Sequence, residues 1–278
     1  MKKVCKTLLA TAVVASMSLC VTGCFGAAKE LKQLSEQFVE AAIAKEFDDM
    51  ADLCEDDDDA EIMLSPYDND FDPVDAILER ATYSIGKAEV KKDEGSVVVT
   101  ITIPDYDSVI GDADDADDFE DALDDADTID IEVTLEFEKD GDDWVITNLD
   151  DFLADFYGEF YSEDFEFESD YEGWVASENW WASDNGTYSS STSYFDLDLN
   201  IASEYYYEDM SYSFRVYDSD GVLVFVKENI TDYGFLENYA YFSDSGCAYL
   251  DSYPSGTYTF VLYDSNDAEF YRSSCSVR

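Results

Sequence analysis

Residues 129–149 read IDIEVTLEFEKDGDDWVITNL and contain the clearest fold signal in the chain. Apolar and polar residues alternate from Ile129 to Glu138, which is the period of a strand with one buried face. A second apolar run, Trp144 to Leu149, follows across Asp140-Gly141, and Asp-Gly between two such runs is a strong hairpin signal. The stretch therefore predicts two antiparallel strands joined by a tight turn.

The same reading extends toward the N-terminus. Ala88–Lys92 and Val97–Ile103 form a second predicted hairpin across Asp93-Glu94-Gly95. Asp72-Pro73 is typical of an N-cap followed by proline at the first helical position, and it predicts a helix over Val74–Ala81. Earlier apolar residues recur at helix spacing, namely Leu31, Leu34, Phe38, Ala42 and then, after a bend, Phe47, Met50 and Leu53. Helices followed by a mostly antiparallel sheet predict an α+β domain over residues 24–157.

The first 23 residues have the pattern of an export signal. Met1 to Lys6 carry three lysines and no acid, and an apolar run from Thr7 to Cys20 follows. That run is too short for a spanning helix, which needs about 20 residues. Val21-Thr22-Gly23-Cys24 resembles the lipobox of bacterial lipoproteins, with small residues before the cysteine that is acylated. We therefore expect a signal peptide over 1–23 and a lipid anchor on Cys24, whereas a chance cysteine after an ordinary signal peptide is the alternative.

The lipobox and two later segments carry a resemblance to a known family. The segments are Phe38-Val39-Glu40-Ala41-Ala42 with Glu46-Phe47-Asp48-Asp49-Met50, and Lys139-Asp140-Gly141-Asp142-Asp143-Trp144-Val145-Ile146. Over roughly residues 28–155 the chain resembles small lipoproteins with a nuclear transport factor 2-like, or cystatin-like, fold. The resemblance implies a curved sheet wrapped around a helix, with a cone-shaped pocket. Enzymes of this family use acid/base residues there, often His or Asp, and many membrane-anchored members have no assigned activity.

Composition limits the function. The chain has 67 acidic and 15 basic residues and a formal net charge of −52. Such a surface repels nucleic acid and anionic headgroups and attracts cationic peptides, metal ions or a cationic wall component, although the charge could also serve solubility alone. Histidine is absent, which excludes His-based triads and HExxH zinc sites. GxGxxG, P-loop, GxSxG and CxxC motifs are absent too.

One acidic segment is a candidate cation site. Residues 111–127 hold nine aspartates, one glutamate and no base, yet Ala113, Ala116, Phe119, Leu123 and Ala126 form an amphipathic stripe. Like charges on one helix repel each other, so this helix must be stabilised by burial of its apolar stripe, by counter-cations, or by both. We expect a solvated acidic face, with weak Ca²⁺ binding as the alternative, because EF-hand spacing is missing. The cation candidates are Asp114, Asp117, Asp118 and Asp121.

The remainder predicts a β-sandwich over residues 173–278, joined by a linker over 158–172. Alternation at Tyr194–Asn200 and a hairpin of Ser213–Tyr217 with Val222–Lys227 are the strongest signals, and Cys247–Asp251, Thr257–Tyr263 and Phe270–Val277 are further predicted strands. Pro-Ser-Gly-Thr-Tyr-Thr-Phe-Val at 254–261 resembles the closing strand of immunoglobulin-like modules. Export permits a Cys247–Cys275 disulfide, although two buried thiols fit equally well, and Cys54 is expected in the core.

Aromatic residues suggest a binding role for the sandwich. Trp174, Trp180, Trp181 and Tyr206 lie in or beside turn-like segments, where exposed rings can stack on sugars or anchor a protein. The alternative is that most of them are core. Trp180 and Trp181 are the pair least easily explained as core, because adjacent strand residues point to opposite faces.

Together these features predict a lipid-anchored protein on the extracytoplasmic face of a membrane, with a non-enzymatic role in binding or display. A carbohydrate-binding module and an enzyme using the cone pocket are the two alternatives. No cofactor is expected apart from weak Ca²⁺, and the expected partners are the membrane and a cationic or glycan ligand.

Overall fold

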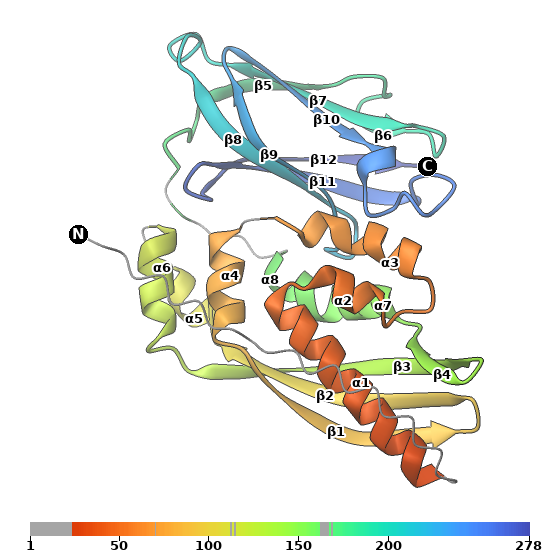
Figure 1. Ribbon diagram of the computed structural model, residues 1–278. Coiled ribbons are helices and arrows are strands. Elements are labelled where there is room, and N and C mark those ends of the chain that lie inside the picture. The colour runs from red at the N-terminus through yellow and green to blue at the C-terminus, as the bar shows by residue number, and fades with distance from the viewer. Residues whose placement is uncertain (1–23, 70, 112, 114, 162–166, 168) are drawn as a thin grey trace.

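The computed structural model describes residues 24–278 except 70, 112, 114, 162–166 and 168. The predicted signal peptide and residues 162–166 and 168 of the predicted linker therefore lie outside the described residues. The chain has the predicted mixed α+β class, with helices and one sheet in the N-terminal part and two sheets in the C-terminal part (Figure 1).

The N-terminal sheet has four antiparallel strands in chain order, and both predicted hairpins are confirmed. One face carries Val97, Val99, Val133 and Leu135, all buried, whereas Glu132 and Glu136 of the third strand are exposed on the other face. In the first hairpin the turn is Lys92-Asp93, because pairing already starts at Lys91 and Glu94. The strands are β1 (Thr82–Lys91), β2 (Glu94–Pro104), β3 (Thr128–Asp140) and β4 (Asp143–Ile146).

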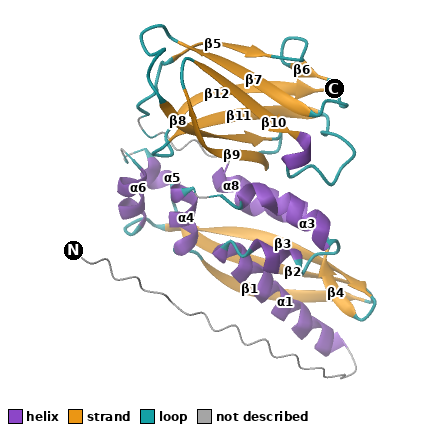
Figure 2. Ribbon diagram, turned by 45° about the horizontal axis from the view of Figure 1, so that its top comes forward, coloured by secondary structure: helices purple, strands orange, loops and turns teal. Residues whose placement is uncertain are grey.

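Helices cover the apolar face of this sheet (Figure 2). α1 packs so closely on β2 that a Cβ at Gly95 would collide with Leu31. One predicted boundary is wrong: Phe71, not Asp72, is the N-cap of α4, and Asp72 is already helical with Pro73 behind it. The helices are α1 (Cys24–Ala44), α2 (Phe47–Ala51), α3 (Asp57–Leu64), α4 (Asp72–Glu79), α5 (Asp107–Ile110), α6 (Ala116–Leu123), α7 (Leu149–Phe152) and α8 (Gly158–Tyr161).

Among the described residues of the acidic segment, only 116–123 form a helix, α6, so Ala113 and Ala126 of the predicted stripe lie outside it; the helix has both expected kinds of support. Phe119 and Leu123 are buried, which anchors the apolar stripe. Arg80 supplies a counter-cation, with its Nη2 2.8 Å from the carboxylate of Asp124. The N-terminus is capped by the Asp115 side chain, which accepts a hydrogen bond from the Asp118 amide at 2.9 Å.

The C-terminal part is a β-sandwich of a three-stranded and a five-stranded sheet. Their orders are β10-β7-β5 and β6-β12-β11-β8-β9, antiparallel except for β6 with β12. The predicted strand Cys247–Asp251 is wrong: these residues form turns, which pair with no strand. The strands are β5 (Val175–Trp180), β6 (Thr187–Tyr188), β7 (Tyr194–Ile201), β8 (Met210–Tyr217), β9 (Leu223–Asp232), β10 (Phe235–Tyr241), β11 (Gly256–Asp264) and β12 (Glu269–Val277).

A shared core joins the two parts. The outer side of the five-stranded sheet contributes Tyr217, Leu223 and Tyr263 to the same buried cluster as the N-terminal helices. The hydroxyl of Tyr67 accepts a hydrogen bond from the Leu223 amide at 3.2 Å. The helices therefore lie between two sheets, and the three-stranded sheet is the layer farthest from the start of α1 (Figures 1 and 2).

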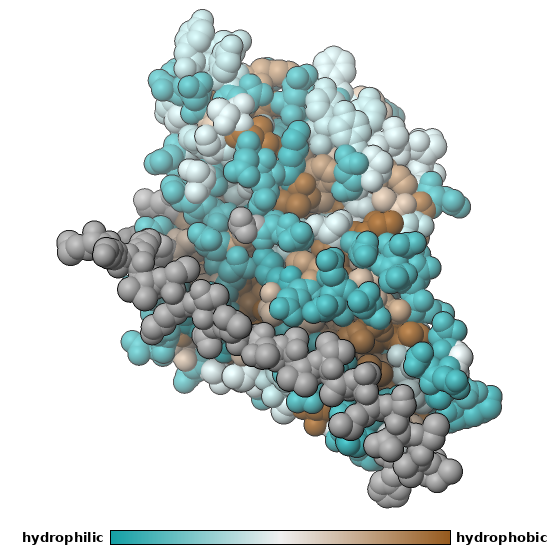
Figure 3. Space-filling model, viewed as in Figure 1, coloured by the Kyte–Doolittle hydropathy of each residue, from teal (hydrophilic) through white to brown (hydrophobic). Residues whose placement is uncertain are grey.

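Hydrophilic residues dominate the visible surface, with brown apolar patches near the junction (Figure 3). In the part of the chain that the structure describes, none of the helices has the length and apolar character needed to cross a membrane.

Candidate functional site

The outer face of the three-stranded sheet gathers aromatic and acidic side chains. Strand alternation on β7 sends Phe195, Leu197 and Leu199 into the core and the residues between them outward. Cross-strand register brings Glu237 opposite Asp198 and Tyr239 opposite Asp196. We call this surface the aromatic–acidic face; it comprises Asn179, Trp181, Tyr194, Asp196, Asp198, Asn200, Phe235, Glu237, Tyr239 and Tyr241.

Two carboxylates at its centre are covered and incompletely bonded. Asp196 and Asp198 are only 6% and 3% exposed, although they point away from the core. The Oδ1 atom of each has no hydrogen-bond partner within the described residues. Glu237 adds a like charge directly across from Asp198, and none of the three strands contains Lys or Arg. Buried polar atoms without partners are costly, so this arrangement favours a bound donor or cation.

The electrostatics follow from this crowding. Burial, assisted by the charge of Asp198, raises the pKa of Asp196 to about 6. Burial likewise raises the pKa of Asp198, and a hydrogen bond from Trp181 partly offsets the rise. Ionisation of these carboxyls therefore costs more free energy on this face than it would in water.

Asp196→Asn should stabilise the protein at alkaline pH. Because the folded-state pKa of Asp196 is raised, its contribution to stability is fully present at acid pH and is lost as pH rises through about 6. Solvent screening limits the gain to roughly 1 kcal/mol, or about 2–4 °C in melting temperature. Thermal melts at about pH 8 should show it, and melts at about pH 4 should show little difference. Glu132→Gln, an exposed acid on the other sheet, is the matched control; a lower melting temperature for Asp196→Asn at pH about 8 would contradict the assignment.

Aromatic rings flank the carboxylates on two sides. Tyr194, Tyr239 and Tyr241 form one group, with ring centroids about 6 Å apart. On the other side, Trp181 and Phe235 border a hollow of about 530 Å³, which Asp198 also lines. Trp181 is 57% exposed, so its ring is free to meet a ligand.

The four predicted stacking residues divide into packed and exposed rings. Trp174 stacks on Tyr205, with ring centroids 4.4 Å apart, and Trp180 packs edge-on against Phe260 at 5.1 Å. Trp181 is exposed, as its opposite strand direction requires, and Tyr206 is half-exposed with its ring against Gly234. The structure thus brings only Trp181 onto the aromatic–acidic face.

Most residues of the aromatic–acidic face were not predicted from the sequence. Asp196, Asp198, Phe235, Glu237 and Tyr239 were not singled out as site residues. The available signal was period-2 alternation on two strands in which aromatic residues share the phase of the acids, as in Phe-x-Glu-x-Tyr-x-Tyr at 235–241. Outward aromatics on a strand are a departure from ordinary polar-out patterning.

The predicted disulfide and the predicted cation site do not form in the described residues. Cys247 and Cys275 are buried free thiols, the second of the two alternatives, and Cys54 is also buried. Asp118 and Asp121 are exposed on α6, whereas Asp114 and the side chain of Asp117 lie outside the described residues. Among the described residues, no group of three or more acidic or cysteine side chains is placed to hold a metal ion.

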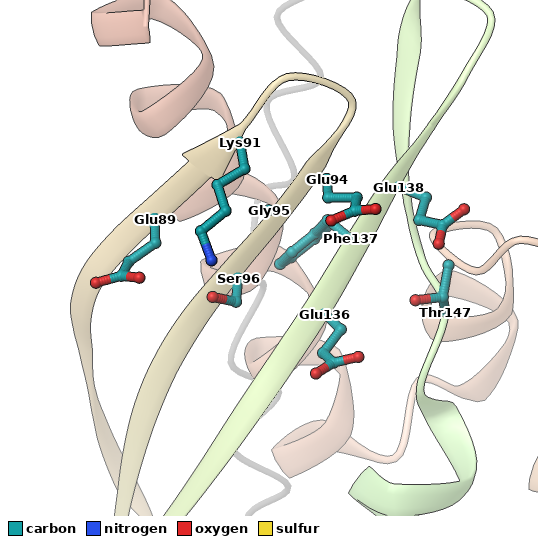
Figure 4. Close-up of a pocket in the computed structure, with 9 residues that line it drawn as sticks. All are labelled: Glu89, Lys91, Glu94, Gly95, Ser96, Glu136, Phe137, Glu138 and Thr147. Atoms are coloured by element: carbon teal, nitrogen blue, oxygen red, sulfur yellow. The ribbon is translucent and has the colours of Figure 1, made fainter.

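A second hollow lies on the four-stranded sheet, on the face opposite the helices. Its volume is about 220 Å³, and Glu89, Ser96 and Glu136 meet there as neighbours across three strands (Figure 4). Lys91 already lies among these exposed acids. On the helix side, by contrast, the space is filled by rings such as Phe38 and Phe152, which meet edge-on at 4.9 Å.

Comparisons with known proteins give little further guidance. No protein-family model matches the sequence, and no curated protein matches it. A solved structure described as "Biofilm associated protein - BSP domain" is similar over 76% of this chain, with 12% identity and a TM-score of 0.26. The chain spans about a third of that protein's length, 32%.

Proposed function

We propose that this chain is a lipid-anchored protein on the extracytoplasmic face of a bacterial membrane, where it binds a ligand without catalysis through the aromatic–acidic face. The observation that carries the proposal is the pair of covered, incompletely bonded carboxylates between two groups of accessible rings. Flat amphipathic aromatic rings provide contact area at low entropic cost, and the charge of the carboxylates provides specificity.

The position of the proposed anchor supports this role. Cys24 is the first residue of α1, whose start lies at the end of the molecule opposite the sandwich (Figure 1). A lipid at Cys24 would therefore hold the acidic N-terminal part next to the membrane and direct the aromatic–acidic face outward.

The architecture supports the two fold assignments that accompany this proposal, a cystatin-like N-terminal part and an immunoglobulin-like C-terminal part. An α1 helix packed on a four-stranded antiparallel sheet is what a cystatin-like resemblance implies, and the two packed sheets suit an immunoglobulin-like module. The filled space between helices and sheet favours binding over a pocket enzyme, which would need an open cavity there.

Pull-down with insoluble polysaccharides and isolated bacterial cell walls tests the proposal. The full-length protein, purified in detergent, should be retained by at least one matrix. Trp181→Ala should weaken retention about tenfold, since exposed Trp residues are frequent binding hot spots. Tyr249→Ala, an exposed aromatic away from this face, is the matched control and should bind normally. Failure to bind any matrix, or equal losses in both variants, would remove the proposed function.

A further inference from the structure

The charge on the aromatic–acidic face indicates which ligand it takes. Asp196, Asp198 and Glu237 crowd together on two neighbouring strands, and their own strands provide no base. A neutral sugar would leave that repulsion in place. A positively charged group in the hollow that Asp198 lines would relieve it.

The flanking aromatic rings suit a ligand that combines a cationic group with a sugar ring. Trp181 and Phe235 border the hollow beside Asp198, and ring faces attract ammonium groups as well as the apolar faces of sugars. Asn179 and Asn200 line the same hollow, and their amides can both donate and accept hydrogen bonds, as sugar hydroxyls require.

The backbone around the site argues against a peptide. Extended peptides are commonly bound by adding a strand to a free sheet edge. The two aspartates lie on β7, which is the central strand and is already paired with β10 and β5 on both sides. A ligand reaching these carboxylates must lie across the face of the sheet and contact side chains only.

We infer that the aromatic–acidic face binds a glycan whose sugars carry free, protonated amino groups. The ammonium group lies in the hollow beside Asp198, attracted by the charges of Asp198, Asp196 and Glu237, while Trp181 stacks on the sugar ring and the amides of Asn179 and Asn200 meet hydroxyls. This inference rests on the proposed function and specifies its ligand class.

Calorimetry with the full-length protein in detergent tests it, using glucosamine hexasaccharide, N-acetylglucosamine hexasaccharide and hexalysine at neutral pH. Glucosamine hexasaccharide should bind at least about tenfold more tightly than its acetylated form, because acetylation removes the charge. The double variant Asp196→Asn/Asp198→Asn should lose about tenfold or more of that affinity. The matched variant Glu132→Gln/Glu136→Gln removes the same charge from the other sheet and should bind like the wild type.

The outcomes separate the two proposals. Equal binding of both hexasaccharides, still dependent on Trp181, would overturn the amino-sugar assignment and leave the proposed function standing. Tighter binding of hexalysine would replace the glycan with a basic peptide, and equal losses in both double variants would reduce the effect to general charge attraction. Binding of none of the three ligands, together with an empty pull-down, would overturn both proposals. Circular dichroism of each variant confirms that it is folded.

Discussion

Arg215→Ala should lower the free energy of unfolding by about 3–5 kcal/mol, the usual cost of removing one partner of a buried ion pair. The Arg215 side chain is completely buried at the junction of the two parts. Its guanidinium carbon lies 3.8 Å from the ring centroid of Phe71 and 4.5 Å from that of Tyr263, and Nη2 is 3.7 Å from an oxygen of Asp267. Alanine would leave both a cavity and an uncompensated carboxylate.

The double variant Arg215→Met/Asp267→Asn separates these contributions. Methionine fills the space between the rings, and asparagine removes the charge that would otherwise remain unpaired. Replacing a buried ion pair by groups of similar volume is often close to neutral, so stability should stay within about 1 kcal/mol of the wild type. Urea denaturation followed by tryptophan fluorescence and circular dichroism measures both variants, and an Arg215→Ala protein as stable as the wild type would contradict the interpretation.

The pH dependence gives an independent check on Arg215→Ala. Burial raises the pKa of Asp267 to about 6 even with Arg215 opposing the shift, so removing the cation should raise it further. A raised carboxyl pKa means that protonation favours the folded state, so the deficit of Arg215→Ala should shrink as pH falls from alkaline values toward about 6, through the higher pKa that Asp267 has in the variant, and should change little below about 6. A deficit that grows with acidity would rule out Asp267 as the cause.

Arg215 also illustrates what the sequence could not predict. In the run Ser213-Phe214-Arg215-Val216-Tyr217 the alternation places Phe214 and Val216 inward and Arg215 outward. Outward normally means solvent, but here that side of the five-stranded sheet is covered by the N-terminal helices. The pattern of one strand carries no information about a layer contributed by residues elsewhere in the chain, such as Phe71 and Tyr161.

The aromatic–acidic face shows the same limit. Tyr194–Asn200 was correctly predicted as a strand with Asp196 and Asp198 on one side. Their near-complete burial depends on neighbours such as Trp181 and Tyr239, whose positions are set by strand register. Strand existence could therefore be predicted from local alternation, whereas the site could not. The prediction of a strand over Cys247–Asp251 was wrong for a related reason, because an apolar run forms a strand only if a partner strand lies beside it.

Cys24→Ala should release the protein from the membrane fraction. Acyl chains contribute about 0.8 kcal/mol per buried methylene group, and two or more of them make anchoring stable. Without the thiol no chain can be attached, so membrane association should fall from nearly complete to background. Metabolic palmitate labelling and fractionation of bacterial cells expressing the full-length chain measure both steps.

Cys20→Ala is the matched control for this experiment. Cys20 lies in the same export segment but follows the bulky Leu19, whereas Cys24 follows Gly23 in a lipobox-like sequence. This variant should retain label and membrane association at the wild-type level. Because the aromatic–acidic face lies far from α1, the released Cys24→Ala protein should still bind its ligand with unchanged affinity (Figure 1). A Cys24→Ala protein that stays with the membranes, or a wild type that takes up no palmitate, would show that the anchor is not a lipid on this cysteine.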